Sequence, residues 1–128
     1  MKICYTPVGT VSNKVKHRRD MPLEGVLSVI RIRKAYKKAL FRIADYPYLW
    51  ILCYPHLADR KVLRVRKRKF RDKGKLRGVF AMHSPDRPNP LAMTRVRLVS
   101  VRGCVLKVEG LDMIDGTPVL DIKSVQDG

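Results

Sequence analysis

The chain has 128 residues, of which 45% are hydrophobic, 28 are Lys or Arg and 11 are Asp or Glu, giving a formal net charge of +17. A chain of this length builds one core, and no apolar stretch approaches the roughly 18 residues that a membrane-spanning helix requires. The three cysteines, Cys4, Cys53 and Cys104, are far apart and form no C-x-x-C pattern, which argues against a disulfide framework or a zinc site. We therefore expect a single soluble, cytoplasmic domain over residues 1–128, with no metal and no membrane partner, and the eight Gly and eight Pro favour a β-rich fold.

The first half of the chain predicts three strands and one helix. Strands are expected at residues 8–11 and 27–33, with a polar loop over residues 13–25 between them. Tyr36, Ala39, Leu40 and Ile43 recur at helical spacing, which predicts a short amphipathic helix near residues 33–44. Pro47 ends that helix, and the apolar run at residues 49–54 predicts a central strand covered on both faces.

The second half predicts more strands and two tight turns. In residues 61–70, Leu63 and Val65 alternate with arginines, which is typical of a half-buried strand with a cationic face. Residues 78–82 predict a short apolar strand. Residues 94–101 and 104–109 flank Arg102-Gly103 and predict a hairpin, and Asp115-Gly116 predicts a turn before a last strand at residues 119–123.

The positive charge is concentrated in one segment. Residues 60–77 contain eleven Lys or Arg and one acid, whereas residues 105–128 contain two basic and five acidic residues. A cationic cluster attracts polyanions and gains affinity by releasing condensed counterions, so a nucleic acid is the partner that the charge favours. The alternative is a solvated basic surface without a specific partner.

Two further segments carry unusual side chains. Residues 83–90 contain three prolines, which stiffen the loop and hold Arg87 and Asn89 in fixed directions, as in a binding loop. The alternative is a rigid turn in which Asn89 satisfies nearby backbone groups. Residues 110–123 contain three aspartates, which suit a cationic ligand such as the sulfonium and amino group of S-adenosylmethionine, although Asp-Gly-Thr-Pro is also ordinary turn chemistry.

Together these motifs resemble the TsaA-like (TrmO) family. The family pattern, roughly G-V-F-A-x-R-S-P-x-R-P-N-P-I-G followed by G-x-D-x-x-D-G-T-P-V-L-D-I-K, is matched by residues 78–81, 84–85, 87–90 and 112–123. Residues 8–11 and the segment from Leu40 to His56 extend the resemblance over almost the whole chain. The sequence differs from the pattern at His83, Ala92 and Tyr48, and at Ser124-Val125 near its end.

The resemblance implies a fold, a cofactor and a substrate. It implies an antiparallel β-barrel that forms a homodimer, with S-adenosylmethionine bound by loops at one side of the barrel near the dimer contact. Characterised bacterial members methylate N6 of threonylcarbamoyladenosine beside the tRNA anticodon, which makes tRNA the implied partner. The absence of a G-x-G-x-x-G turn agrees with a fold other than a Rossmann-type methyltransferase.

The resemblance also implies which residues act. Methyl transfer to nitrogen is an in-line displacement in which one proton must leave, and Asp115 or Asp112 is the candidate acceptor. The expected cofactor-binding residues are Met21, Pro22, His56, Leu57, His83, Arg87, Met93, Asp112, Met113, Ile114 and Asp115. The expected tRNA-binding residues are Arg64, Arg66, Lys67, Arg68, Lys69, Arg71 and Asn89.

Two alternatives to this function stay open on sequence grounds. One is a methyltransferase that uses the same cofactor on another RNA position or on a small molecule. The other is a non-catalytic, basic RNA-binding barrel. Measuring cofactor binding separates the second alternative from the enzymes.

Overall fold

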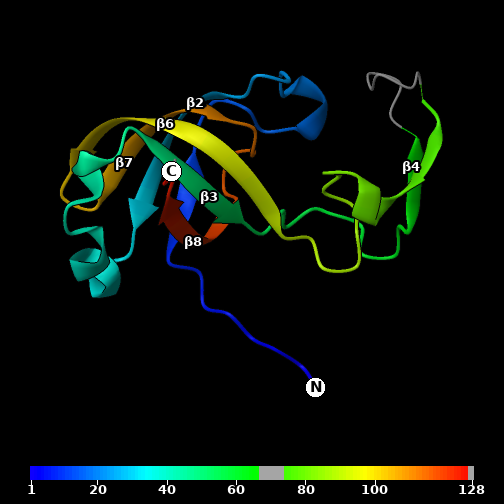
Figure 1. Cartoon of the computed structure of the whole chain (residues 1–128), viewed down its shortest axis with the longest axis horizontal. Coiled ribbons are helices and arrows are strands. Elements are labelled where there is room, and N and C mark those ends of the chain that lie inside the picture. The colour runs from blue at the N-terminus through cyan, green and yellow to red at the C-terminus, as the bar shows by residue number, and fades with distance from the viewer. Residues whose placement is uncertain (67–73, 127–128) are drawn as a thin grey trace.

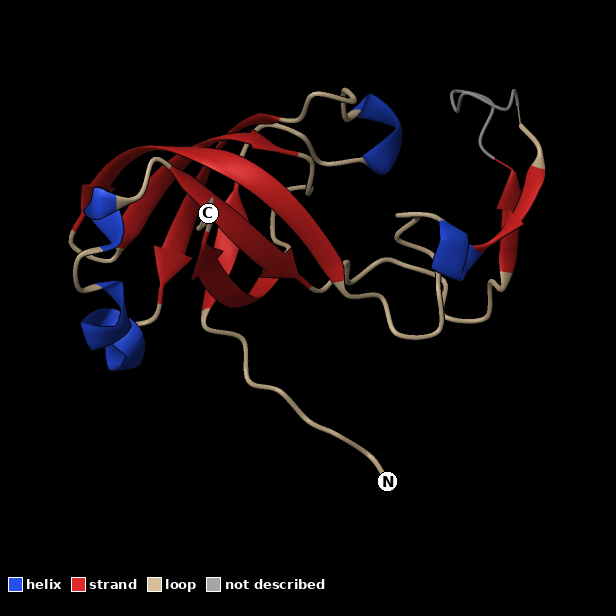
Figure 2. Ribbon diagram, in the orientation of Figure 1, coloured by secondary structure: helices blue, strands red, loops and turns tan. Residues whose placement is uncertain are grey.

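A closed antiparallel barrel of six strands forms the body of the protein (Figures 1 and 2). The computed structural model describes residues 1–66 and 74–126. Around the barrel the strand order is β1-β2-β7-β6-β3-β8, which confirms the mainly β barrel expected from the sequence. The strands are β1 (Gly9–Ser12), β2 (Val26–Ile32), β3 (Tyr48–Cys53), β6 (Ala92–Arg102), β7 (Val105–Leu111) and β8 (Pro118–Ser124).

The core lies inside the barrel and is built from alternate residues of each strand, because successive side chains of a strand point to opposite faces. In β3, Leu49, Ile51 and Cys53 are buried, whereas Trp50 and Leu52 are half-buried. The strand pairs with β6 on one side and β8 on the other, so it is central as expected, but its outer face is only partly covered. Other buried core residues are Val11, Ile30, Ile32, Val96, Leu106, Val108, Leu111 and Val119.

Residues 54–66 and 74–91 leave the barrel and form a separate lobe beside it (Figure 1). The lobe contains a two-stranded sheet of β4 (Arg64–Arg66) and β5 (Leu76–Gly78) and a 3-10 turn, η4 (Val79–Ala81). Of the strand expected over residues 61–70, residues 64–66 form β4, residues 61–63 lie outside any strand, and residues 67–70 lie outside the described part of the chain.

The prediction of a strand at residues 78–82 was wrong. After Gly78 the backbone turns into η4, where Met82 donates its N–H to the Val79 carbonyl. The Arg87 guanidinium binds the carbonyl oxygens of both Val79 and Met82, so these groups are satisfied within the lobe instead of in a strand ladder. The segment is apolar because two of its side chains, Val79 and Met82, are buried.

The helical segment expected near residues 33–44 forms as two 3-10 helices, η2 (Lys34–Leu40) and η3 (Ile43–Asp45). They separate at Arg42, which has a positive φ of 66° and therefore cannot continue a helix. Tyr36, Leu40 and Ile43 pack against the core, as the periodicity predicted. Within the described residues, no helix combines the length and apolarity needed to cross a membrane.

The two predicted turns are confirmed. Gly103, with φ 57°, lies in the tight turn between β6 and β7, and Gly116, with φ 85°, lies in the turn before β8. Where β2 begins, Gly25 lies so close to the end of β7 that a Cβ atom there would be 2.5 Å from the carbonyl carbon of Gly110. This contact brings the loop before β2 to the segment after β7.

Candidate cofactor and RNA site

One end of the barrel gathers most of the loops that the sequence singled out. The last residue of β3, Cys53, pairs with the first residue of β6, Ala92, and also with Val119 of β8. The segment after β7, which contains Asp112 to Asp115, and the turn at Met21-Pro22 meet through the Gly25–Gly110 contact. The loops that contain the expected cofactor residues therefore leave the barrel at a common end.

Asn13, which follows β1, holds the aspartate-rich segment in place. Its side-chain amide donates to the Met113 carbonyl at 2.8 Å and to the Ser28 hydroxyl at 3.0 Å, and its backbone N–H donates to Asp115 Oδ1 at 3.0 Å. Its own Oδ1 accepts the N–H of Val15. Sequence reasoning missed this residue by treating residues 13–25 as a polar loop. The available signal was an Asn, whose side chain both donates and accepts hydrogen bonds, two residues after a predicted strand.

The two candidate proton acceptors have different surroundings. Asp115 forms an ion pair with Lys16, with Nζ and Oδ2 2.6 Å apart. The hydrogen bond from Lys16, followed by that from the Asn13 backbone, lowers the pKa of Asp115, which makes it a weak base at neutral pH. Asp112 is exposed and accepts a hydrogen bond from the Thr94 hydroxyl at 2.6 Å. Asp115 is thus engaged in an ion pair, whereas Asp112 forms none within the described residues.

Arg87 and Asp86 fix the shape of the proline-rich loop. The Arg87 guanidinium donates to three carbonyl oxygens, those of Val79, Met82 and Ser84, at 2.8–3.1 Å. Both terminal nitrogens of Arg87 are thus already bound within the lobe. The Asp86 carboxylate accepts two hydrogen bonds from Arg18 of η1 (Arg18–Asp20), at 3.0 and 2.9 Å, which tie the lobe to the loop between β1 and β2.

Asn89 lies beside the basic segment. Its Oδ1 accepts a hydrogen bond from the Arg60 guanidinium at 3.2 Å, and Arg60 also binds the Pro88 carbonyl at 2.8 Å. The Asp59 backbone N–H donates to Asp86 Oδ1. Arg18, Asp59 and Arg60 were not among the expected site residues, because a charged residue in a basic loop gives no sequence signal of its partner.

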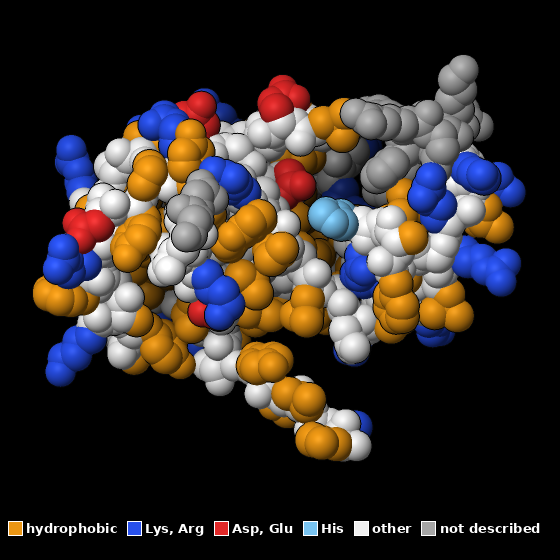
Figure 3. Space-filling model, in the orientation of Figure 1, with side chains coloured by type: hydrophobic (Ala, Val, Ile, Leu, Met, Phe, Trp, Pro, Cys, Tyr) orange, Lys and Arg blue, Asp and Glu red, His pale blue; other side chains and the backbone are white. Residues whose placement is uncertain are grey.

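Two of the expected RNA-binding cations are described, and both lie on the lobe. Arg64 and Arg66 are exposed on β4, while Lys67, Arg68, Lys69 and Arg71 lie outside the described residues. Figure 3 shows Lys and Arg side chains over the lobe and the rim of the molecule, and hydrophobic side chains gathered over the barrel. His56 and His83 are both exposed. Among the described residues, no group of three or more His, Cys, Asp or Glu is arranged to hold a metal ion.

Exposed apolar side chains and a carboxylate lie at this end of the barrel. Leu57, Leu91 and Met93 are 63%, 55% and 56% exposed, and Asp112 adds a carboxylate. Apolar surface accommodates an adenine ring and a thioether, and a carboxylate attracts a sulfonium or ammonium group. Met93 points outward from β6, whereas Thr94, which donates to Asp112, points inward. The side chains at this end therefore do not all lie on one face of the barrel wall. The hollow of about 250 Å³ elsewhere in the molecule contains none of them.

The chain matches the family model described as the tRNA-methyltransferase O N-terminal domain over residues 10–127. The chain belongs to this family. It is 41% identical over 127 residues to a probable S-adenosyl-L-methionine-binding protein of Methanothermobacter thermautotrophicus, covering 96% of this chain and 90% of the relative. It is 36% identical over 126 residues to the tRNA (adenine(37)-N6)-methyltransferase of Homo sapiens, covering 91% of this chain and 29% of that protein.

Solved structures of the family have the same fold. TrmO from P. aeruginosa superposes with a TM-score of 0.78 at 25% sequence identity, covering 98% of this chain and 55% of that one. This chain therefore spans about half the length of the solved TrmO chain. The fold of this chain is therefore that of the solved TrmO structure over 98% of the chain's length.

Proposed function

We propose that this protein is an S-adenosylmethionine-dependent methyltransferase that methylates N6 of adenosine in the anticodon loop of tRNA. The observation that carries the proposal is the family match over residues 10–127. It is supported by the aspartate-rich segment, which Asn13 fixes, and by exposed apolar side chains at the same end of the barrel. The names of the Methanothermobacter and human relatives supply the cofactor and the nucleotide, adenine 37.

The cofactor would be held by the loops at the common end of the barrel. Apolar contacts would come from Met21, Pro22, Leu57 and Met93, and attraction for its positive charges from Asp112. When bound, S-adenosylmethionine supplies the methyl group. The protein's own residues position the accepting nitrogen in line, and Asp112 takes the proton that leaves it. The remaining expected contacts are His56, His83, Arg87, Met113, Ile114 and Asp115.

Within this set the structure favours a division of roles. Ile114 is buried and the Met113 carbonyl is bound by Asn13, so this part of the segment supports the loop. Arg87 is engaged with three carbonyls, and Asp115 is paired with Lys16. We infer that these residues position the loops, and that His56, His83 and Asp112, which are exposed, are available to touch bound molecules.

The tRNA would lie against the lobe. Its phosphates would meet Arg64 and Arg66 of β4 and the basic residues that follow, and Asn89 lies on the same lobe beside Arg60. We further infer a homodimer in the cytoplasm. The exposed apolar side chains at the common end support a second copy completing the cofactor site, and three free cysteines fit a reducing compartment.

Isothermal titration of the purified protein with S-adenosylmethionine and S-adenosylhomocysteine tests the cofactor. We expect one site per chain for both ligands, with at least tenfold weaker S-adenosylmethionine binding in Asp112→Asn. Glu109→Gln is the matched control, because Glu109 is an exposed carboxylate on β7 outside the segment. Absence of binding at millimolar cofactor would leave the non-catalytic RNA-binding barrel as the better account.

Methyl transfer to tRNA tests the reaction. Transfer of labelled methyl groups to unfractionated tRNA, followed by nucleoside mass spectrometry, identifies the methylated nucleotide. Comparison of tRNA with and without the threonylcarbamoyl group on adenosine 37 then decides whether that modification is required. Cofactor binding without transfer to either tRNA would favour the alternative of another RNA position or a small molecule.

A further inference from the structure

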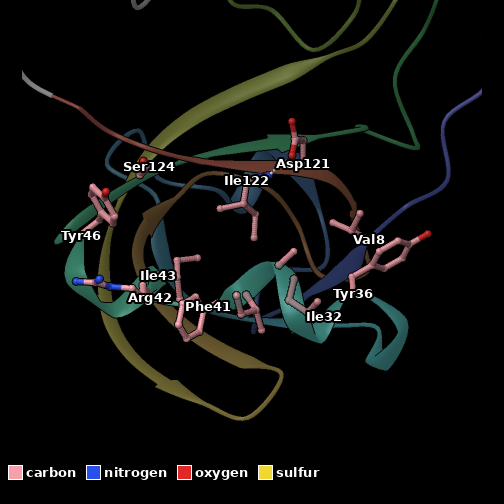
Figure 4. Close-up of a pocket in the computed structure, with 12 residues that line it drawn as sticks. Val8, Ile32, Tyr36, Phe41, Arg42, Ile43, Tyr46, Asp121, Ile122 and Ser124 are labelled. Carbon is pink, nitrogen blue, oxygen red and sulfur yellow. Dashed lines mark hydrogen bonds between the residues drawn. The ribbon is translucent and has the colours of Figure 1, made fainter.

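A groove opens at the seam where the barrel closes, away from the loops of the cofactor site. It encloses about 250 Å³, less than the roughly 300–1,000 Å³ of a typical ligand pocket. Figure 4 shows Ile32, Ile43 and Ile122 along it, with Tyr36 and Val8 toward one end and Tyr46 and Arg42 toward the other. The groove is thus a narrow apolar channel between the 3-10 helices and β8.

One wall of the groove is an incompletely paired strand. β1 and β8 pair only at Gly9–Val119 and Thr10–Pro118, whereas β8 continues to Ser124. Beyond Val119, the described strand neighbour of β8 is β3 alone. The backbone N–H of Ile122 donates to the side-chain Oδ1 of Asp121, so a side chain satisfies it in place of a neighbouring strand. Such an edge is a template for another strand.

The segment that would extend β1 along this edge points elsewhere. Residues 1–7 form an extended arm that leaves the barrel below β1 (Figure 1). Val8 donates its N–H to the Val119 carbonyl, but no hydrogen bond from residues 1–7 to the rest of the described chain is present. Met1, Ile3 and Tyr5 are 112%, 68% and 70% exposed. The arm therefore has both unpaired backbone and unburied apolar side chains.

The arm has the alternation that the groove requires. Gly9 and Val11 of β1 face the core and Thr10 faces solvent, but Val8 also packs against the core, so the alternation is interrupted where the arm begins. Within the arm, an extended backbone places Ile3 and Tyr5 on one face and Lys2, Cys4 and Thr6 on the other. Ile3 and Tyr5 would then lie over the apolar channel, and the polar side chains would remain in water.

We propose that the arm of one copy of this chain pairs with β8 of a second copy and fills its groove, in a reciprocal exchange. The proposal rests on the homodimer proposed above. A second copy, not the arm's own barrel, is the occupant because the chain before Val8 runs away from the residues that line its own groove (Figure 4). Extended segments add to exposed strand edges in this way, and identical segments are readily exchanged between protomers.

The expected register follows from the pairs already present. Leu120 is skipped in the pairing of β8 with β3, which passes from Leu52–Asp121 to Cys53–Val119. A bulge at that residue moves the register by one and places Cys4 opposite Val125 on the outer face. Directly opposite residues in an antiparallel pair have Cα atoms about 4.5–5.5 Å apart, which a disulfide can bridge.

Val125→Cys tests the exchange in the full chain, because Cys4 is exposed and free. Under mild oxidation we expect most chains to form covalent dimers on a non-reducing gel, with peptide mapping that joins residue 4 of one copy to residue 125 of the other. Cys4→Ser combined with Val125→Cys should abolish the link. Arg102→Cys, at the distant β6–β7 turn, controls for random oxidation.

The other outcomes overturn the proposal in distinguishable ways. An internally bridged monomer would show that the arm folds onto its own barrel, and no bridge between residues 4 and 125 would show that the arm does not occupy the groove. Sedimentation of the double variant Ile3→Ser, Tyr5→Ser gives an independent readout, with an expected rise of at least tenfold in the dimer dissociation constant. A dimer unaffected by it would leave the homodimer standing and remove the exchange, whereas a monomeric unaltered protein would remove both.

Discussion

Two of the three cysteines, Cys4 and Cys53, have very different environments. Cys53 is 1% exposed at the end of β3, and burial, followed by the negative charge of Asp112, raises the pKa of its thiol to about 12. Cys4 lies exposed on the arm. The raised pKa makes the thiolate fraction of Cys53 at pH 8 roughly a thousandfold smaller than that of an ordinary thiol. Because the thiolate is the reactive form, Cys53 should react slowly.

We expect iodoacetamide at pH 8 to alkylate Cys4 rapidly and to leave Cys53 unmodified until the protein unfolds, as peptide mass spectrometry would show. Because the folded protein keeps this thiol neutral and the unfolded chain ionises it near pH 9, the associated stabilisation is lost as the pH rises from 9 toward 12. Equal modification of Cys4 and Cys53 in native buffer would contradict the burial of Cys53.

The contribution of Asp115 to the stability of the fold has the opposite dependence on pH. Its pKa is lowered by the hydrogen bonds from Lys16 and the Asn13 backbone, so its ionised form stabilises the fold above the ordinary carboxyl pKa near 3.9. That stabilisation is lost as the pH falls through the lower pKa of the folded state. We expect Asp115→Asn to reduce the free energy of unfolding at pH 7 by about 0.5–1 kcal/mol, the size of a partly exposed ion pair.

Urea unfolding at several pH values measures this effect. The difference between Asp115→Asn and the unaltered protein should shrink toward zero as the pH falls through the lowered pKa of the folded state, because the carboxyl is then protonated in both the folded and the unfolded protein. Asp20→Asn is the matched control, since the Asp20 carboxylate is exposed and forms no ion pair within the described residues. A difference that stayed constant with pH would show that the substitution acts through packing instead of charge.

At the level of elements, the contact between the start of β2 and the end of β7 depends on a glycine. Gly25 has φ 75°, and an added Cβ would lie 2.5 Å from the Gly110 carbonyl carbon. We expect Gly25→Ala to lower the free energy of unfolding by at least about 2 kcal/mol, because backbone strain and a backbone clash add together.

Gly103→Ala separates the two contributions. Gly103 also has positive φ, 57°, but no atom lies within 4 Å of the Cβ position. Its cost should be near the roughly 1–2 kcal/mol of a left-handed residue alone. If thermal or urea unfolding gave equal losses for the two variants, the close approach of Gly25 to Gly110 would have no energetic role.

The elements also show what the sequence could and could not predict. Period-two and helical patterns located the barrel strands, the β6–β7 hairpin and the apolar face of residues 36–43, because burial enforces those patterns directly. Residues 78–82 were assigned the wrong element because Arg87, five or more residues away, takes their carbonyls. The role of Asn13 likewise depends on Met113 and Asp115, about a hundred residues distant, which local patterns do not contain.

For the whole molecule, the net charge of +17 is unevenly distributed, so the lobe and the end of the barrel with the cofactor loops differ in the sign of their exposed charges. Arg64 and Arg66 are exposed on β4 of the lobe, and Asp112 and Asp115 lie at the barrel end. A polyanion is therefore attracted to the lobe, while the aspartates favour the cationic part of a cofactor. This separation lets the proposed substrate and cofactor bind together with little competition between their charges.

The salt dependence of tRNA binding tests that arrangement. Each phosphate contact contributes about one unit to the slope of log affinity against log salt concentration, so Arg64→Ala with Arg66→Ala should weaken binding severalfold at low salt and reduce the slope by about two. Lys107→Ala is the control, because Lys107 is an exposed cation on β7 of the barrel. S-adenosylmethionine binding should be unchanged in both variants, since neither β4 nor Lys107 belongs to the cofactor loops. If Lys107→Ala lowered the slope and the β4 variant did not, tRNA would lie against the barrel, and the lobe would not be its binding surface.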